Sequence, residues 1–230
     1  MKAYKKEFID FLLANDALKF GEFTLKSGRI SPYFLNTGML HNGEAVLKLG
    51  RFYAATIKDN VKEDYNVIFG PAYKGIPLAI TTINALYTDY KINVFYSFNR
   101  KEAKDHGDKG VLVGKKLTDE DRVVLIDDVI TAGTAIRESL HIIAEESKAI
   151  VQAVVLSVDR MEKGRGKKSA IQELSESTGI KFYPIVNILE IMEYLKGQEI
   201  NGKKIIDQKT LEKMLEYRNK YGVINGDGPR

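Results

Sequence analysis

Cysteine is absent from the 230-residue sequence, and that absence excludes disulfide bonds and thiolate metal sites. Apolar runs are short, and none approaches the ~18 residues that a membrane-spanning helix requires. Acidic residues stand at Glu7 and Asp10, where a secretory signal peptide would carry an unbroken apolar core. These absences predict a cytoplasmic protein with no membrane partner.

The sequence also lacks a large excess of basic over acidic residues. The sequence has 35 Lys and Arg residues against 31 Asp and Glu residues, a net charge of +4, whereas nucleic-acid-binding proteins usually show a stronger and more clustered basic excess. We therefore expect no nucleic-acid partner, although the charge is compatible with anionic substrates. With 44% hydrophobic and 29% charged residues, the chain is long enough for one well-buried α/β domain.

The most informative stretch is residues 123–135, VVLIDDVITAGTA. The four apolar residues at 123–126 predict a strand buried on both faces, as in a parallel sheet covered by helices. Small and hydroxylated residues follow at 131–134, and the apolar residues after them have helical spacing. A strand, a tight loop and a helix N-terminus form an anion site, because backbone amides and the helix dipole both favour a phosphate.

Asp127 and Asp128 lie between that strand and that loop, where carboxylates would repel a phosphate unless they have another role. They can accept hydrogen bonds from sugar hydroxyls or hold Mg²⁺ through water, so the combination suits a sugar phosphate. The stretch is neither a P-loop, which needs a lysine before Ser or Thr, nor the dinucleotide fingerprint, which needs three spaced glycines. The simpler alternative is a buried strand that ends in a polar turn.

A second strand, loop and helix occupies residues 67–87. The strand at 67–69 runs into a glycine-bearing loop that carries Lys74. Ligands of open α/β sheets bind at the carboxyl edge, where this loop would lie. A short loop with a lysine suits a pyrophosphate.

Residues 99–110 combine glycines and many charges with no apolar periodicity, which predicts an exposed mobile loop. Its cationic residues are Arg100, Lys101, Lys104 and His106. A solvated charge run is the ordinary explanation of such a segment. The alternative is a cationic cluster that closes over an anionic leaving group.

Residues 20–36 are rich in turns and hold Lys26, Tyr33 and Phe34. The two rings offer stacking area and the lysine offers charge, so the segment could grip a flat anion. A surface hairpin is the alternative. Farther along the chain, an apolar strand at 150–158 ends in Asp159 and Arg160.

Strands and helices alternate along nearly the whole sequence. We expect strands near 67–69, 92–98, 123–126, 150–158 and 181–186, and helices near 4–15, 46–61, 76–87, 136–144, 170–177, 188–195 and 209–221. This order predicts an α/β fold with a central, mostly parallel sheet flanked by helices. Because no repeat or long linker divides the chain, we expect a single domain over residues 1–230.

Residues 123–135 resemble the phosphoribosyl-pyrophosphate (PRPP) binding motif of type I phosphoribosyltransferases. The segments KSGR (26–29) with SPYF (31–34), and RKEAKDHG (100–107), narrow the resemblance to the orotate phosphoribosyltransferase family of the bacterial and yeast type. Together with SVDR (157–160), these segments span nearly the whole chain. The resemblance implies the type I phosphoribosyltransferase fold, with a small base-binding hood built from residues 1–40.

The implied reaction is Mg²⁺-dependent transfer of the 5-phosphoribosyl group from PRPP to N1 of orotate. Its products are orotidine 5′-monophosphate and pyrophosphate, and it belongs to UMP biosynthesis. Mg²⁺ would be held mainly by substrate oxygens and water, with no direct protein ligand. The resemblance also implies a homodimer in which the loop at 99–114 completes the neighbouring active site.

Individual residues take roles from the same resemblance. The implied catalytic residues are Arg100, Lys101, Lys104, His106, Asp127 and Asp128. The implied PRPP contacts are Lys26, Tyr73, Lys74, Arg100, Lys101, Lys104, His106, Asp127, Asp128, Val129, Ile130, Thr131, Ala132, Gly133, Thr134 and Ala135. The implied orotate contacts are Lys26, Tyr33, Phe34, Thr131 and Arg160, with Arg160 facing the carboxylate of the base. The pair Tyr33 and Phe34 departs from the two phenylalanines of many relatives but keeps the stacking area.

Three alternatives stay open at this point. A phosphoribosyltransferase for a purine or for uracil would share the central motif but would give no reason for the segment at 26–36. A PRPP-sensing regulator that binds nucleic acid would not need the cationic segment at 99–110. A nucleotide-binding structural protein is the third alternative.

Overall fold

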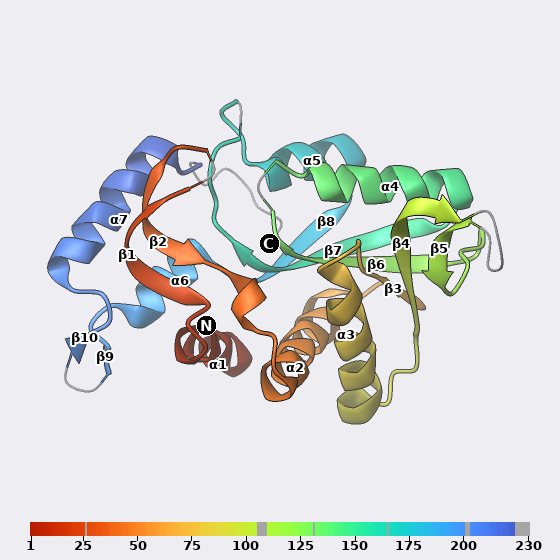
Figure 1. Cartoon of the computed structure of the whole chain (residues 1–230), viewed down its shortest axis with the longest axis horizontal. Coiled ribbons are helices and arrows are strands. Elements are labelled where there is room, and N and C mark those ends of the chain that lie inside the picture. The colour runs from red at the N-terminus through yellow and green to blue at the C-terminus, as the bar shows by residue number, and fades with distance from the viewer. Residues whose placement is uncertain (26, 105–109, 131, 165, 201–202, 224–230) are drawn as a thin grey trace.

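The computed structural model describes residues 1–25, 27–104, 110–130, 132–164, 166–200 and 203–223, without the side chains of residues 103, 104, 200 and 203. A six-stranded sheet crosses the molecule (Figure 1). In spatial order its strands are β5 (Gly110–Gly114), β4 (Phe95–Lys104), β3 (Val67–Phe69), β6 (Arg122–Val129), β7 (Ile150–Asp159) and β8 (Lys181–Asn187). Neighbouring strands run parallel except for β5, which is antiparallel to β4. The predicted α/β class with a mostly parallel sheet is confirmed.

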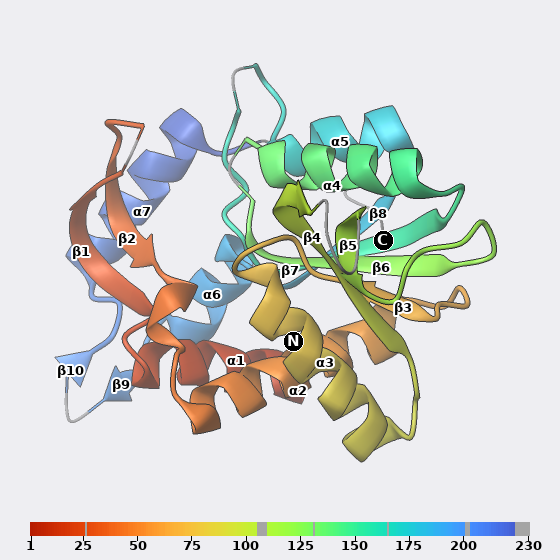
Figure 2. The same cartoon turned by 45° about the vertical axis from the view of Figure 1, so that its right-hand side comes forward.

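Helices cover both faces of this sheet, as Figures 1 and 2 show. The helices on one face are α1 (Ala3–Ala14), α2 (Gly43–Asn60), α3 (Gly75–Tyr90) and α6 (Ile188–Leu195), and those on the other are α4 (Thr134–Glu146) and α5 (Ala170–Thr178). Strand β6 contributes alternate side chains to the two cores: Val124 and Ile126 to the first, Val123 and Leu125 to the second. All four are fully buried, which explains the unbroken apolar run in the sequence.

A smaller unit lies beside the sheet. Strands β1 (Leu18–Thr24) and β2 (Ile30–Leu35) form an antiparallel hairpin, and helix α7 (Gln208–Tyr221) lies beside it in both views (Figures 1 and 2). The Tyr33 ring of β2 meets the Tyr217 ring of α7 edge-on, with centroids 6.1 Å apart. We call β1, β2 and α7 the hood. The short 3₁₀ helix η1 (Thr37–Met39) leads from the hood back to α2.

The N-terminal segment supplies the hairpin of the hood, as expected, but its helix α1 packs elsewhere. Helix α1 buries Phe8, Ile9 and Leu12 in the core of the main sheet. The partner of the hairpin is instead α7, whose sequence lies near the other end of the chain. Strands β9 (Glu199–Ile200) and β10 (Lys203–Lys204) form a separate two-stranded ribbon before α7.

The cationic segment at 99–110 was predicted to be a loop, and for its described part that prediction is wrong. Strand β4 continues to residue 104, and β5 begins at Gly110, with Asn99 opposite Leu112 in the ladder. Leu112 is 5% exposed and packs in the second core, which gives the pairing an apolar anchor. Residues 105–109 lie outside the described part.

Within the described residues, no helix has both the length and the apolar character needed to cross a bilayer.

Candidate active site

The carboxyl edge of the sheet brings three segments to one carboxylate. Asp127 and Asp128 lie near the carboxyl end of β6, and Asp128 Oδ2 accepts hydrogen bonds from Lys74 Nζ at 2.7 Å and from Thr37 Oγ1 at 2.9 Å. Lys74 ends the loop between β3 and α3, and Thr37 begins η1. The two strand-loop-helix segments singled out in the sequence therefore meet at this edge, as their parallel strands require.

Hydrogen bonds from α2 and β7 fix the backbone at the carboxyl end of β6. The buried Tyr53 hydroxyl of α2 donates to the Asp127 carbonyl oxygen at 2.7 Å, and the Ser157 hydroxyl of β7 donates to the Asp128 carbonyl oxygen at 2.5 Å. The side chains also bind their own backbone, since Asp127 Oδ1 accepts from the Asp128 amide at 2.8 Å and Asp128 Oδ1 from the Val129 amide at 2.6 Å. The direction of both carboxylates is thus set before any ligand arrives.

Asp127 has an unusual acidity. Burial, and after it the neighbouring Asp128 carboxylate, raise the pKa of Asp127 from its ordinary value of 3.8 to about 6. Lys74 opposes this rise only in part. A ligand that supplies hydroxyl donors or a cation to this carboxylate would relieve the cost of its charge.

The loop after β6 and the start of α4 present backbone amides. Gly133 has φ +74°, and a Cβ there would lie 2.8 Å from Leu174 Cδ1, so the turn needs glycine. The N-cap residue of α4 is Gly133, which has no side chain to cap the helix, and Ala132, Thr134 and Ala135 are exposed. Uncapped amides at an exposed helix N-terminus suit a phosphate. Val129 and Ile130 are half-buried, and Thr131 lies outside the described residues.

The loop between β3 and α3 presents two exposed side chains. Tyr73 is 72% exposed, and the Lys74 side chain is 63% exposed although its amine reaches Asp128. The amide of Ala72 donates to Asn99 Oδ1 at 3.1 Å, which ties this loop to β4. The loop therefore stands beside the cationic strand.

The structure describes the side chains of two of the four predicted cations of that strand. Arg100 is half-buried and its Nη1 donates to the Gly110 carbonyl oxygen at 3.3 Å, while Lys101 is exposed. The Lys104 side chain, His106 and Lys26 lie outside the described part.

The two aromatic residues of β2 face in opposite directions, as neighbours in a strand do. Phe34 stacks on Phe23 with centroids 5.3 Å apart and stays half-buried. Tyr33 is only 1% exposed, because the Arg160 guanidinium lies 4.3 Å from its ring centroid and Tyr217 meets its edge. Of this pair, only Phe34 has a surface that a flat ligand can reach in this structure.

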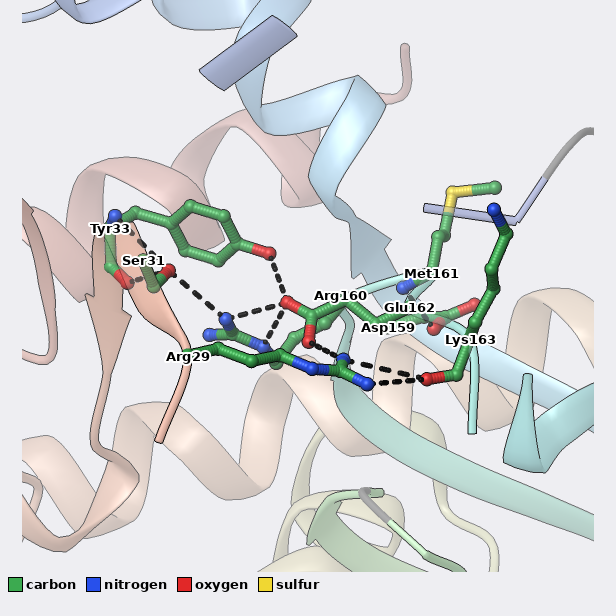
Figure 3. Close-up of polar contacts among 8 residues, drawn as sticks. All are labelled: Arg29, Ser31, Tyr33, Asp159, Arg160, Met161, Glu162 and Lys163. Atoms are coloured by element: carbon green, nitrogen blue, oxygen red, sulfur yellow. Dashed lines mark hydrogen bonds and ion pairs between the residues drawn. The ribbon is translucent and has the colours of Figure 1, made fainter. Parts of the chain in front are cut away.

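Arg160, which follows β7, is 9% exposed and reaches the base of the hood. Its Nε and Nη2 atoms both approach Glu162 Oε1, at 2.9 and 2.7 Å (Figure 3). Burial alone would lower the pKa of Arg160, but its neighbours Tyr33 and Glu162 raise it above the ordinary value. The guanidinium therefore stays charged where it could meet an anionic base.

Metal-binding capacity at this edge is limited. Within the described part of the chain, no three acidic or histidine side chains gather closely enough to hold a metal ion. Asp127 and Asp128 provide the hard oxygen donors that Mg²⁺ prefers, but three of their four carboxylate oxygens already accept hydrogen bonds. This donor set fits an Mg²⁺ ion that takes most of its ligands from substrate and water.

Comparisons with known proteins agree with this geometry. A family model described as the phosphoribosyl transferase domain matches residues 36–183. An orotate phosphoribosyltransferase of Clostridium botulinum (strain Alaska E43 / Type E3) is 50% identical over 223 residues, which cover 97% of this chain and 100% of the relative. One from Vibrio cholerae serotype O1 is 51% identical with the same coverage. The chain belongs to the orotate phosphoribosyltransferase family.

A solved orotate phosphoribosyltransferase supports the assignment in three dimensions. The crystal structure from Francisella tularensis is 42% identical, covers 94% of this chain and 99% of its own, and gives a TM-score of 0.83. The orotate phosphoribosyltransferase resemblance drawn from the motifs is therefore confirmed, as is the type I phosphoribosyltransferase fold. The roles of individual residues stay predictions.

Two residues at the site escaped the sequence analysis. Thr37 binds Asp128, and Glu162 binds Arg160, yet neither lies in one of the motifs. The only available signal for Glu162 was its place two residues after Arg160. Nothing in the sequence around Thr37 indicated its contact.

Proposed function

We propose that this chain transfers the 5-phosphoribosyl group of PRPP to N1 of orotate and releases orotidine 5′-monophosphate and pyrophosphate, a step of pyrimidine synthesis. The observation that carries the proposal is the contact of Lys74 with the Asp128 carboxylate of β6, beside a helix N-terminus whose N-cap residue is a glycine. It occurs in a chain about half identical to enzymes named for this reaction.

In this proposal the sugar phosphate lies over the end of β6. Thr131 and the loop through Ala135 take the 5′-phosphate, and Asp127 and Asp128 accept hydrogen bonds from the ribose hydroxyls. Lys74, Tyr73 and Lys26 contact pyrophosphate. Lys74 has an exposed stem and would exchange its bond with Asp128 for one with the more highly charged ligand.

The leaving group is stabilised by the cations of the segment at 99–114. The transition state of this displacement is expected to resemble an oxocarbenium ion, so negative charge develops on the departing pyrophosphate. Arg100, Lys101, Lys104 and His106 supply opposite charge there. His106 is also the side chain whose ordinary pKa is nearest neutrality, so it suits a proton donor to pyrophosphate.

The base lies between the sheet edge and the hood. Phe34 offers a ring for stacking, Arg160 faces the orotate carboxylate, and Lys26 and Thr131 complete the contacts. In this arrangement Tyr33 does not touch the base, and its ring packs against the Arg160 guanidinium.

Mg²⁺ is the proposed metal, bound chiefly through substrate oxygens and water near Asp127 and Asp128. When bound, it would neutralise charge on the pyrophosphate group. We place the enzyme in the cytoplasm, on the basis of its enzyme type.

The decisive experiment follows orotate absorbance after mixing purified protein with PRPP and Mg²⁺. We expect PRPP-dependent loss of the orotate signal, and no turnover in parallel reactions with uracil, hypoxanthine or adenine. Asp128→Asn should lower kcat by about 100-fold or more, because it removes a charged contact to the ribose. Turnover of another base but not of orotate would overturn the proposal.

We also propose that the enzyme is a homodimer with shared active sites, in which the segment at 99–114 of one protomer serves its partner. Lys104→Ala and Asp128→Asn chains should each be nearly inactive alone. Mixed together and allowed to exchange subunits, they should regain up to about a quarter of the native activity, because one site in each heterodimer is intact. A heterodimer with no recovered activity would contradict shared sites.

A further inference from the structure

Glu162 occupies the centre of the polar cluster shown in Figure 3. Its Oε1 atom accepts from Arg160 Nε at 2.9 Å and from the Tyr33 hydroxyl at 3.1 Å, and it lies 2.7 Å from Arg160 Nη2. The Glu162 side chain is only 16% exposed and that of Arg160 only 10%. One carboxylate oxygen thus holds one edge of the guanidinium.

A second arginine approaches the other oxygen of Glu162. Arg29 Nη1 lies 3.4 Å from Glu162 Oε2, and the two terminal nitrogens of Arg29 donate to the Lys163 carbonyl oxygen at 3.5 and 3.4 Å. The Arg29 guanidinium also lies 4.7 Å from the centroid of the Tyr221 ring of α7. Glu162 therefore bridges the strand end at β7 to the hood.

The charges of this cluster do not cancel. Arg29, Arg160 and Lys163 contribute three positive charges, and Glu162 and Asp159 at most two negative charges, since burial raises the pKa of Asp159. Burial also raises the pKa of Tyr33 well above its ordinary value and keeps the phenol neutral. One more anionic group would reduce this excess of positive charge. A carboxylate on the base has the required charge.

The hydrogen bonds of Arg160 engage the Nε and Nη2 atoms of its guanidinium. Glu162 takes the edge formed by Nε and Nη2, and the Ser31 hydroxyl accepts from Nη2 at 3.2 Å. Ser31 Oγ in turn donates to the Tyr33 carbonyl oxygen at 2.7 Å. The Tyr217 side chain also interacts with Arg160 and Glu162, and no hydrogen bond of the described residues is made by Nη1 of Arg160 at normal distance and angle.

We propose that Glu162 is a positioning residue for base recognition: it fixes Arg160 by the Nε and Nη2 edge and turns Nη1 toward the carboxylate of orotate. This inference rests on the proposed function of Arg160. Glu162 acts through Arg160 and touches no reacting atom, so its effect belongs to orotate binding and not to the chemical step.

The test is a kinetic comparison of Glu162→Gln with the native enzyme. Glutamine keeps the size of the side chain and one accepting oxygen but loses the charge that aligns the guanidinium. We expect KM for orotate to rise about tenfold, while kcat and KM for PRPP change by less than about threefold. Glu162→Asp keeps the charge at a shorter reach and should recover part of the lost affinity.

Two further variants separate the possible outcomes. Glu176→Gln removes an exposed partner of Lys168 and should leave all three constants unchanged. Arg160→Ala should raise KM for orotate by more than Glu162→Gln does. If Arg160→Ala raises this KM but Glu162→Gln does not, the positioning role is wrong and the role of Arg160 stands.

Other results would be equally clear. A fall in KM for orotate in Glu162→Gln would mean that Glu162 competes with the substrate for Arg160, which overturns the proposal. An equal loss in kcat and in both KM values, together with a lowered melting temperature, would indicate a structural role and overturn it too. A native enzyme that does not turn over orotate would instead refute the proposed function itself.

Discussion

At the scale of single residues, Asp127 carries the clearest chemical signature. The chain places two adjacent carboxylates at the end of a fully buried strand, and one of them has a pKa raised to about 6. The folded protein therefore holds a proton on Asp127 at pH values where the unfolded chain has released it. Ionisation of Asp127 therefore lowers the free energy of unfolding of the protein.

This cost predicts a pH-dependent gain in stability for Asp127→Asn. Between the unfolded pKa of 3.8 and the folded pKa of about 6, the native state binds more protons than the unfolded state. The stability contributed by this group is thus present at low pH and is lost as the pH rises through 6. At pH 7.5 the variant should unfold with a free energy up to about 3 kcal/mol larger than that of the native protein.

Urea denaturation of both proteins from pH 4 to pH 7.5 measures this difference. Comparing the two proteins at each pH removes the contributions of titrating groups that do not interact with Asp127. The difference should be near zero at pH 4 and should grow toward pH 7. A constant difference over this range would contradict the raised pKa.

At the scale of elements, η1 connects the hood to the catalytic edge. It begins at Thr37, whose hydroxyl donates to Asp128 Oδ2. The Asn36 side chain caps this short helix by accepting from the Gly38 amide at 3.1 Å. The two contacts fix η1 between the hairpin and β6, so the hood and the PRPP site share one polar link.

Thr37→Val should remove the hydrogen bond to Asp128 while keeping a side chain of nearly the same size. The variant removes a hydrogen bond to a charged group, worth about 1.5–3 kcal/mol, and leaves Lys74 as the only described side chain that binds Asp128 Oδ2. We expect KM for PRPP to rise about three- to tenfold, because Lys74 is then less free to leave for pyrophosphate. Thr37→Ser keeps the hydroxyl and serves as the control, and equal kinetics in the two variants would show that the hydrogen bond is unimportant.

At the scale of the whole molecule, the main sheet packs against an apolar core on each face, whereas the described residues of the hood join the first of these cores. The hood contributes Leu18 and Tyr33 of the hairpin and Met214 and Tyr217 of α7 to that core. The hood is a two-stranded hairpin against one helix, and hairpins of this size are marginal without such packing. Tyr217, 6% exposed on α7, packs its ring against Tyr33 of β2.

Tyr217→Ala should therefore loosen the hood selectively. Truncating a buried aromatic side chain typically costs about 3–5 kcal/mol, and here the loss falls on one small unit. In hydrogen exchange we expect faster exchange in β1 and β2, with unchanged protection in β6 and β7. Leu215→Ala, on the same helix but 48% exposed, is the matched control. Uniform loss of protection throughout the sheet would contradict a separately stabilised hood.

The sequence predicted the sheet well because its signals are local. The apolar residues 123–126 and the two acids after them could be placed at the carboxyl edge of a parallel strand without knowledge of any distant contact. The same rule placed Lys74 at that edge, and the structure brings Lys74 to Asp128.

The missed features depend on contacts between distant segments. Thr37 lies 91 residues from Asp128, and Tyr33 lies 129 residues from Glu162. No local pattern encodes those pairs, and the burial of Tyr33 follows from a helix near the other end of the chain. The hairpin of β4 and β5 was missed for another reason. Its exposed charges, such as Lys101 and Glu102, conceal the alternation that marks a strand.

The pairing of β2 with α7 has a consequence for the order in which the molecule assembles. Contacts between parts of the chain so far apart in sequence form late, because a long loop must close before they gain any stability. The sheet can reach its native arrangement first, and the receptor for the base would be completed only afterwards. Partly folded molecules, in which the sheet has formed but the hood has not, would then bind the sugar donor but not the nucleobase.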